Sequence, residues 1–171
     1  MYKGREYEIY FPINSGDTSI EGVELATYQK LHFLGVPALN WFGVQANWTY
    51  INMEGEDRKI LAQMPKHVIN FALTYDNPDI GFSGTVGLNW NGMVFEKYEK
   101  GVPIWNTPIH RLDASANYAL TDNIRVYVRG KNLLDSPGDP EWEYKPTLDE
   151  TRLHEIKYYG RWFSAGIDYS L

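Results

Sequence analysis

The chain has 171 residues, no cysteine and a formal net charge of −6 at pH 7, and aromatic side chains make up 15% of it. This length predicts one domain, and the acidic balance argues against a nucleic-acid partner, which would require a basic surface. The absence of cysteine excludes a disulfide framework, and no apolar run approaches the roughly 20 residues that a membrane-spanning helix needs.

Apolar and polar residues alternate along most of the chain, as they do in a β-strand with one apolar face. In chain order the predicted strands are residues 5–11, 20–30, 41–52, 66–75, 80–90, 112–120, 124–133 and 161–171. No segment shows the 3.6-residue period of an amphipathic helix. The sequence therefore predicts an all-β fold, an antiparallel up-and-down meander of about eight long strands.

The last predicted strand has an unbroken apolar row, formed by Phe163, Ala165, Ile167, Tyr169 and Leu171. The residues between them are small or polar. A soluble domain usually ends in a polar, frayed tail. A chain that ends on an amphipathic strand is typical of an outer-membrane barrel, in which the C-terminal strand closes the barrel.

The connections between the predicted strands fall into two groups when they are assigned alternately to the two ends of the sheet. Those at one end are mostly short, at 121–123, 76–79 and roughly 31–40, and those at the other are mostly long and charged, at 135–157, 92–108, 53–65 and 12–19. Outer-membrane barrels have short periplasmic turns and longer external loops. Strands of about 11 residues, tilted near 45°, also match their apolar band of about 25 Å. The meander is thus expected to be part of a transmembrane β-barrel.

The alternation assigns side chains to two faces. We expect lipid contact for Phe42, Val44, Trp48, Phe71, Leu73, Val86, Leu88, Val126 and Ile167, and a lumen-facing position for Gln45, Asn47, Asn70, Thr85, Asn117, Arg125, Arg129 and Lys131. Candidates for the aromatic girdles at the membrane interfaces are Trp48, Tyr50, Tyr75, Trp90 and Tyr118. The basic row Arg125, Arg129 and Lys131 either pairs with carboxylates or lines a path for an anionic substrate.

No catalytic or metal-binding pattern is found. The histidines His32, His67, His110 and His154 lack the spacing of metal ligands, and no GxSxG, P-loop or GxGxxG motif follows a strand. The acidic residues Asp135, Asp139, Glu141 and Glu143 form an expected solvated loop rather than a cation site. The sequence predicts neither an enzyme nor a protein with a cofactor.

Five segments, taken together, resemble the C-terminal barrel of TonB-dependent receptors. They are GVELATYQKL, GVQANWTYIN, MPKHVINFALTYDN, LDASANYALTDNIRVYVRGKNLLD and GRWFSAGIDYSL. The resemblance implies that residues 1–171 form a single segment, the last third or so of a barrel of 22 strands, without the plug domain. It also implies that Phe163, Ile167, Tyr169 and Leu171 form the signal for barrel assembly.

The resemblance implies an outer-membrane location and a function in the uptake of scarce nutrients such as siderophore-bound iron, cobalamin or oligosaccharide. The implied partners are outer-membrane lipid, the remainder of the barrel and its plug, the TonB system through that plug, and the barrel-assembly machinery. Two alternatives stay open: a complete eight-stranded barrel that acts as an adhesin or anchor, and a soluble β-barrel or sandwich that binds a ligand. Small lumen residues such as Ser83, Gly87 and Ser115 favour a wide barrel over a small, filled one.

Overall fold

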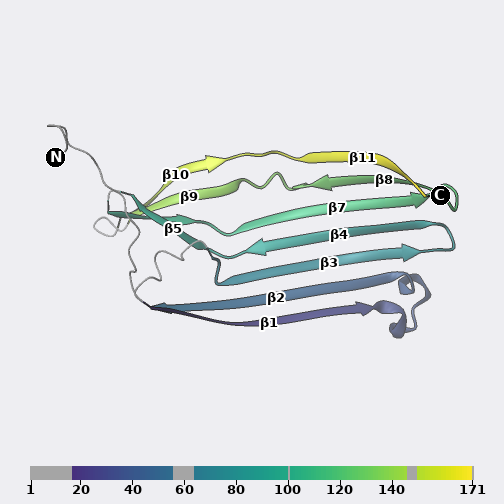
Figure 1. Ribbon diagram of the computed structural model, residues 1–171, viewed down its shortest axis with the longest axis horizontal. Coiled ribbons are helices and arrows are strands. Elements are labelled where there is room, and N and C mark those ends of the chain that lie inside the picture. Colours follow the sequence, from purple (N-terminus) through teal and green to yellow (C-terminus); the bar gives the residue numbers. More distant parts are fainter. Residues whose placement is uncertain (1–16, 56–63, 100, 146–149, 171) are drawn as a thin grey trace, which may run out of the picture.

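The computed structural model describes residues 17–55, 64–99, 101–145 and 150–170. The strands among these residues form two antiparallel sheets (Figure 1). The larger sheet has seven strands in the order β1-β2-β3-β4-β7-β8-β11. Their bounds are Thr18–Lys30 (β1), Phe42–Gly55 (β2), His67–Asn77 (β3), Phe82–Asn91 (β4), Ile109–Ala119 (β7), Ile124–Lys131 (β8) and Trp162–Tyr169 (β11).

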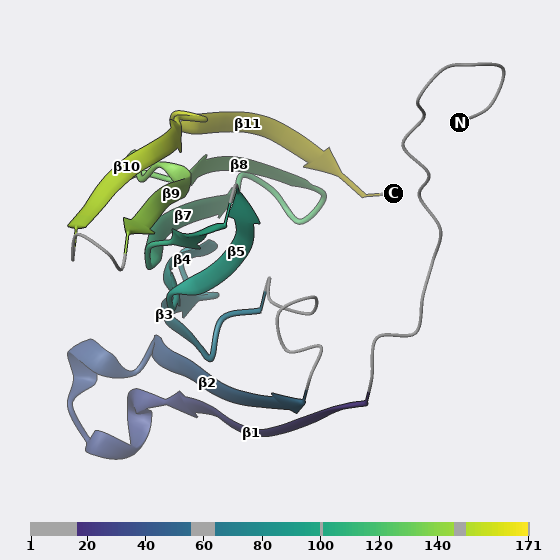
Figure 2. The same ribbon diagram turned by 90° about the vertical axis from the view of Figure 1, so that its left-hand side faces the viewer.

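Each strand of the larger sheet pairs with the strand that precedes or follows it in this sheet, and every pairing is antiparallel. The predicted all-β meander of long strands is therefore confirmed. Figure 2 shows that the sheet is curved, because its strands follow an arc from β1 to β11. The predicted strand at residues 5–11 lies outside the described residues, and the described strands do not close into a barrel, since β1 and β11 lie at opposite edges.

The connections 31–41, 78–81 and 120–123 lie at one end of the larger sheet, which we call the turn rim. The first contains two short 3₁₀ helices, Leu31–Leu34 and Pro37–Leu39. In the second, the Asp79 amide donates to Asn77 Oδ1 over 3.0 Å, and Gly81 adopts a φ of 66° that favours glycine. In the third, Thr121 Oγ1 accepts a 3.0 Å hydrogen bond from the Ile124 amide. Side-chain acceptors thus hold the short turns.

The smaller sheet extends the larger one at its other end, which we call the hairpin rim (Figure 1). It has the order β10-β9-β6-β5, with bounds Val94–Glu99 (β5), Val102–Asn106 (β6), Gly138–Lys145 (β9) and Glu150–Lys157 (β10). The long connections expected at 92–108 and 135–157 therefore contain strands that were not predicted. The strands were predicted from an alternation of apolar and polar residues. Register shifts interrupt this alternation between Phe95 and Lys97, between Leu153 and Glu155, and between Glu155 and Lys157.

The hairpin of β5 and β6 keeps the register of the strands from which it continues. Asn91 pairs with Ile109 in the larger sheet, and Val94 pairs with Asn106 in the smaller one. Gly92 and Met93 separate the paired positions between β4 and β5, and Thr107 and Pro108 separate them between β6 and β7. Because Pro108 has no N–H, the ladder is interrupted there without an inserted residue.

The described part of the chain has almost no buried core. Ile104, in the smaller sheet, is its one fully buried apolar side chain, with no exposed area. The larger sheet is a single layer, and Leu25, Phe71 and Ile167 are among the large apolar residues that it leaves exposed. Within the same residues, no helix is long and apolar enough to cross a membrane.

Candidate functional site

The strand register divides the larger sheet into two chemically different faces. Asn47 pairs with Asn70, and Thr85 pairs with Ser115, which pairs with Arg129. Since paired residues share a face and residues two apart on a strand do as well, the register places a whole polar set together. This face, which we call the polar face, carries Gln45, Asn47, Asn70, Thr85, Asn117, Arg125, Arg129 and Lys131.

The opposite face, the apolar face, carries every residue for which lipid contact was predicted. Val44 pairs with Leu73 and Leu73 with Val86, and in the same way Val126 pairs with Ile167. Phe71 pairs with Leu88 in the next row. Leu73 is 39% exposed and Ile167 is 71% exposed. The apolar face is therefore continuous across the sheet and has no protein cover among the described residues.

A ladder of three asparagines crosses the polar face. Asn89 Nδ2 donates to Asn70 Oδ1 over 2.7 Å, and Asn70 Nδ2 donates to Asn47 Oδ1 over 3.3 Å. Asn47 Nδ2 in turn donates to the carboxylate of Glu24 on β1. The amides thus point in one direction across four strands and end at a negative charge. The ladder gives the polar face an ordered row of hydrogen-bonding groups.

A depression of about 240 Å³ lies in the polar face beside this ladder. Its lining residues are Gln45, Asn47, Asn70, Phe71, Ala72, Gly87, Leu88, Asn89, Arg111 and Asp113. Small side chains at Ala72 and Gly87 leave the space, while Arg111 and Asp113 contribute opposite charges. The depression is open, and its lining combines these charges and the asparagine amides with apolar surface.

Aromatic side chains of the apolar face gather toward its two ends. Toward the hairpin rim, the His67 ring lies 6.0 Å from Trp48 and 5.1 Å from Tyr50, and Trp48 Nε1 donates to His67 Nδ1 over 3.3 Å. Toward the turn rim, the Tyr75 ring lies 4.9 Å from Phe42 and 5.9 Å from Phe82. Trp90 pairs with Ile69 beside the first group, and Tyr118 pairs with Phe82 in the second. The residues predicted for the girdles are thus divided between two bands.

The family described as "TonB dependent receptor-like, beta-barrel" matches residues 3–133, which is most of the chain. The chain belongs to the TonB-dependent receptor-like β-barrel family. Members of this family are transporters of the outer membrane of Gram-negative bacteria. No curated protein and no solved structure matches the chain significantly.

The strand β11 of this receptor barrel segment carries three of the predicted assembly residues on its apolar face. Phe163, Ile167 and Tyr169 are 63%, 71% and 66% exposed, and Leu171 lies outside the described residues. The end of the strand is held to the turn before β8, because the Ser170 amide donates to Asn123 O over 3.0 Å and Asn123 Nδ2 donates to Ser170 O over 2.8 Å. Their role in assembly stays a prediction.

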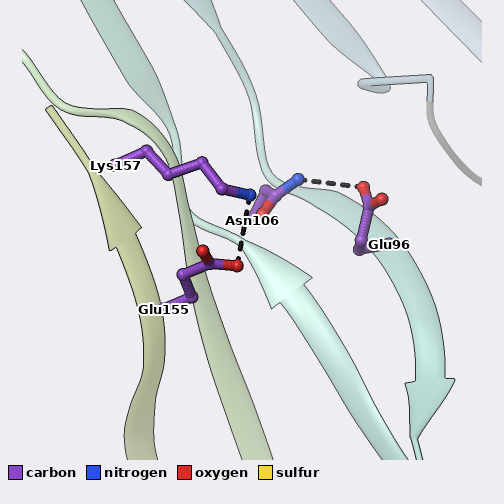
Figure 3. Close-up of polar contacts among 4 residues, drawn as sticks. All are labelled: Glu96, Asn106, Glu155 and Lys157. Carbon is purple, nitrogen blue, oxygen red and sulfur yellow. Dashed lines mark hydrogen bonds and ion pairs between the residues drawn. The ribbon is translucent and has the colours of Figure 1, made fainter. Parts of the chain in front are cut away.

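The charged residues of the receptor's smaller sheet were candidates for a cation site. In the described ranges there is no group of three or more His, Asp or Glu side chains that could hold a metal ion. Figure 3 shows a polar cluster instead, in which Asn106 Nδ2 donates to Glu96 Oε2 over 3.0 Å and Lys157 Nζ lies 3.1 Å from Glu155 Oε2. Asp135, predicted to lie in an acidic loop, precedes β9, whereas Asp139, Glu141 and Glu143 belong to β9.

The strand register of the receptor places several residues on the polar face that were not predicted there from the sequence. Glu24 accepts the last hydrogen bond of the asparagine ladder, and Arg111 lines the depression. Trp162 pairs with Lys131, so this tryptophan lies on the polar face although tryptophan is usually assigned to the apolar one. Neighbouring side chains on a strand point to opposite faces, so the apolar-face position of Phe163 could have predicted that Trp162 lies on the polar face.

Proposed function

We propose that the chain forms part of the barrel wall of an outer-membrane TonB-dependent receptor that imports a scarce nutrient, such as siderophore-bound iron, cobalamin or an oligosaccharide. The observation that carries the proposal is the separation of a continuous apolar face from a continuous polar face by one register across seven strands. A sheet that is apolar on one side and polar on the other is what a wide barrel needs between lipid and an aqueous lumen.

In this arrangement the apolar face contacts lipid and the polar face lines the lumen. Backbone groups at an open sheet edge cost several kcal/mol each in hydrocarbon, so spanning sheets must close. The edges at β1 and β11 therefore pair with the remainder of the barrel. The lumen side then contacts a plug, through which the TonB system supplies energy, and the closing strand is recognised by the barrel-assembly machinery.

The small residues of the polar face support a wide barrel over a complete barrel of eight strands. The barrel of eight strands fills its interior with side chains. Ser83, Thr85, Gly87, Ser115 and Ser164 are too small to do so, and the described strands do not close. The apolar face also argues against a soluble sheet, because the area of apolar surface that it exposes is larger than soluble monomers tolerate.

The test is fractionation and growth of a Gram-negative strain that carries the gene. The protein is expected in the outer membrane, and its deletion is expected to abolish growth on one of the nutrient classes above at limiting concentration. Loss of TonB should produce the same growth defect. A protein found in the cytosol, or growth that is independent of TonB on every nutrient tested, would contradict the proposal.

A further inference from the structure

A column of positive charge runs along β8 on the polar face. Arg125, Arg129 and Lys131 share this face, and Arg111 adds a fourth cation from β7. Arg125 lies near the turn rim and Lys131 at the other end of β8, which is about 20 Å along the strand at about 3.3 Å per residue. The column therefore extends over the full length of β8, although the chain as a whole is acidic.

Aromatic rings hold two of these cations in place. The Arg129 guanidinium lies 4.4 Å from the centre of the Tyr127 ring, and Lys131 Nζ lies 5.7 Å from the centre of the Trp162 ring. A cation–π contact orients the side chain but leaves its formal charge uncompensated. Gly166 leaves room for the Tyr127 ring that contacts Arg129, because a Cβ at position 166 would lie only 2.5 Å from the Tyr127 hydroxyl oxygen.

The carboxylates on this part of the polar face do not balance the column. Asp113 Oδ1 accepts a 2.9 Å hydrogen bond from the Asn132 amide, and Asp168 lies opposite Arg125 in the register. Neither Arg129 nor Lys131 forms an ion pair with another described residue. Opposite Arg129 stand Ser115 and Ser164, which are small and uncharged. Space and charge are therefore both available to an anion.

We propose that this column binds a soluble oxyanion with several carboxylate or phosphate groups, so that the imported nutrient is anionic. The inference rests on the proposed function, because it assigns a substrate class to the same lumen face. An acidic segment of a plug is the competing occupant. The observations favour the solute, since the cations are held in place by the wall itself and are spaced along the whole of β8, so that an anion could pass from one to the next.

The test is calorimetric titration of the full-length protein, purified in detergent at low salt, with citrate and with pyrophosphate as probes. The variant R129Q/K131Q removes two cations of the column, and the matched control K30Q/K66Q removes two cations outside it. We expect saturable binding that weakens about tenfold or more for each column cation removed, because hydrogen bonds to charged groups are involved. Binding by the control should stay within about twofold of the wild type.

Trp162 provides a second readout, because it lies beside Lys131. Citrate should change the tryptophan emission of the wild type and of K30Q/K66Q, and the change should be absent in W162F. Circular dichroism and heat-modifiable migration of both double variants check that they fold. Added salt should weaken binding, since exposed charges are screened over about 10 Å at 0.1 M.

Two results would overturn the inference. The first is a wild type that binds neither probe, or a column variant that binds both as the wild type does. The second is a column variant whose only change is faster proteolysis of an N-terminal domain, which would identify an acidic polypeptide as the occupant. A receptor found in the outer membrane with no affinity for either anion refutes the inference alone. Absence from the outer membrane refutes the proposed function.

Discussion

At the scale of single residues, the asparagine ladder shows why the polar face is more than a row of hydrophilic side chains. Each amide of Asn89, Asn70 and Asn47 donates in the same direction, toward Glu24. Asn70 is the central member, because it accepts one hydrogen bond of the ladder and donates the next. A change at this position therefore alters two interactions, whereas a change at an isolated polar residue alters one or none.

Replacement of Asn70 by aspartate should reveal the direction of the ladder. The carboxylate of N70D can accept from Asn89 but cannot donate to Asn47, so two oxygens face each other. We expect the free energy of unfolding to fall by about 1–2 kcal/mol at pH 7. Part of this loss should be recovered below about pH 4, where the carboxyl group is protonated and can donate.

Urea unfolding of the full-length protein in detergent or lipid, followed by heat-modifiable migration, measures this change. N117D is the matched control, because the Ser83 hydroxyl near Asn117 can donate to a carboxylate as readily as it accepts from the amide. Equal losses in N70D and N117D would show that the ladder has no energetic role.

Arginine substitutions test which face contacts lipid. Leu73 lies between Val44 and Val86 on the apolar face, whereas Thr85 lies between Thr74 and Ser115 on the polar face. L73R is expected to lower the free energy of unfolding in a bilayer by about 2–4 kcal/mol if position 73 is near the midplane. T85R should cost little, because its side chain remains in water.

The same urea titration, carried out in lipid vesicles, compares the two variants. Thr85 serves better than Asn70 as the polar-face position, since a change at Asn70 also disrupts the ladder. Similar costs for L73R and T85R would contradict the assignment of the two faces.

At the scale of elements, alternation predicted the long strands well, and its limits have physical causes. The strands 41–52, 66–75 and 80–90 were placed within a few residues, because each keeps one apolar and one polar side. The hairpins β5–β6 and β9–β10 were missed, because Pro103 and Pro140 and the register shifts interrupt the pattern. Cross-strand contacts such as Lys131 on Trp162 depend on register, which one strand alone does not encode.

The closing strand is expected to carry the assembly signal. Tyr169 is exposed on the apolar face opposite Ile124, near the hydrogen bonds that join Ser170 to Asn123. Replacement of Tyr169 by aspartate, or deletion of Leu171, should lower the level of the full-length receptor in the outer membrane, because the assembly machinery no longer recognises the strand. Immunoblots of membrane fractions measure the level.

V126D is the control for this prediction. Val126 also lies on the apolar face but belongs to β8. If the residues of the closing strand only meet lipid, Y169D and V126D will lower the level by similar amounts. A larger effect of Y169D supports a signal, and unchanged levels in Y169D and the deletion contradict it.

At the scale of the whole molecule, the described residues form a sheet without a conventional core. Apart from Ile104, no large apolar side chain among them is fully buried. The hydrophobic effect that normally stabilises a domain must therefore come from burial of the apolar face in lipid or detergent. The stability of this segment is thus a property of its surroundings as much as of its sequence.

The isolated chain of 171 residues should consequently need detergent to remain in solution. We expect a β-rich circular dichroism spectrum, edge-to-edge association or aggregation when detergent is removed, and no active uptake. Size-exclusion chromatography with light scattering measures the association. A monodisperse monomer without detergent would contradict the membrane assignment, and a heat-modifiable monomer with one sharp pore conductance would support a complete small barrel.

The uninterrupted register between the larger sheet and the β5–β6 hairpin restricts how such a receptor can change during evolution. Val94 and Asn106 continue the pairing of Asn91 and Ile109 because both strands have the same number of intervening residues. One extra residue in either strand would shift the register of the hairpin by one residue. The side chains of Phe95 and Trp105 would then lie on the face that Ile104 now occupies, and Ile104 would lie on theirs. Length changes near Gly92 and Pro108 should therefore occur in both strands together, while the connection at the tip of the hairpin is free to vary alone.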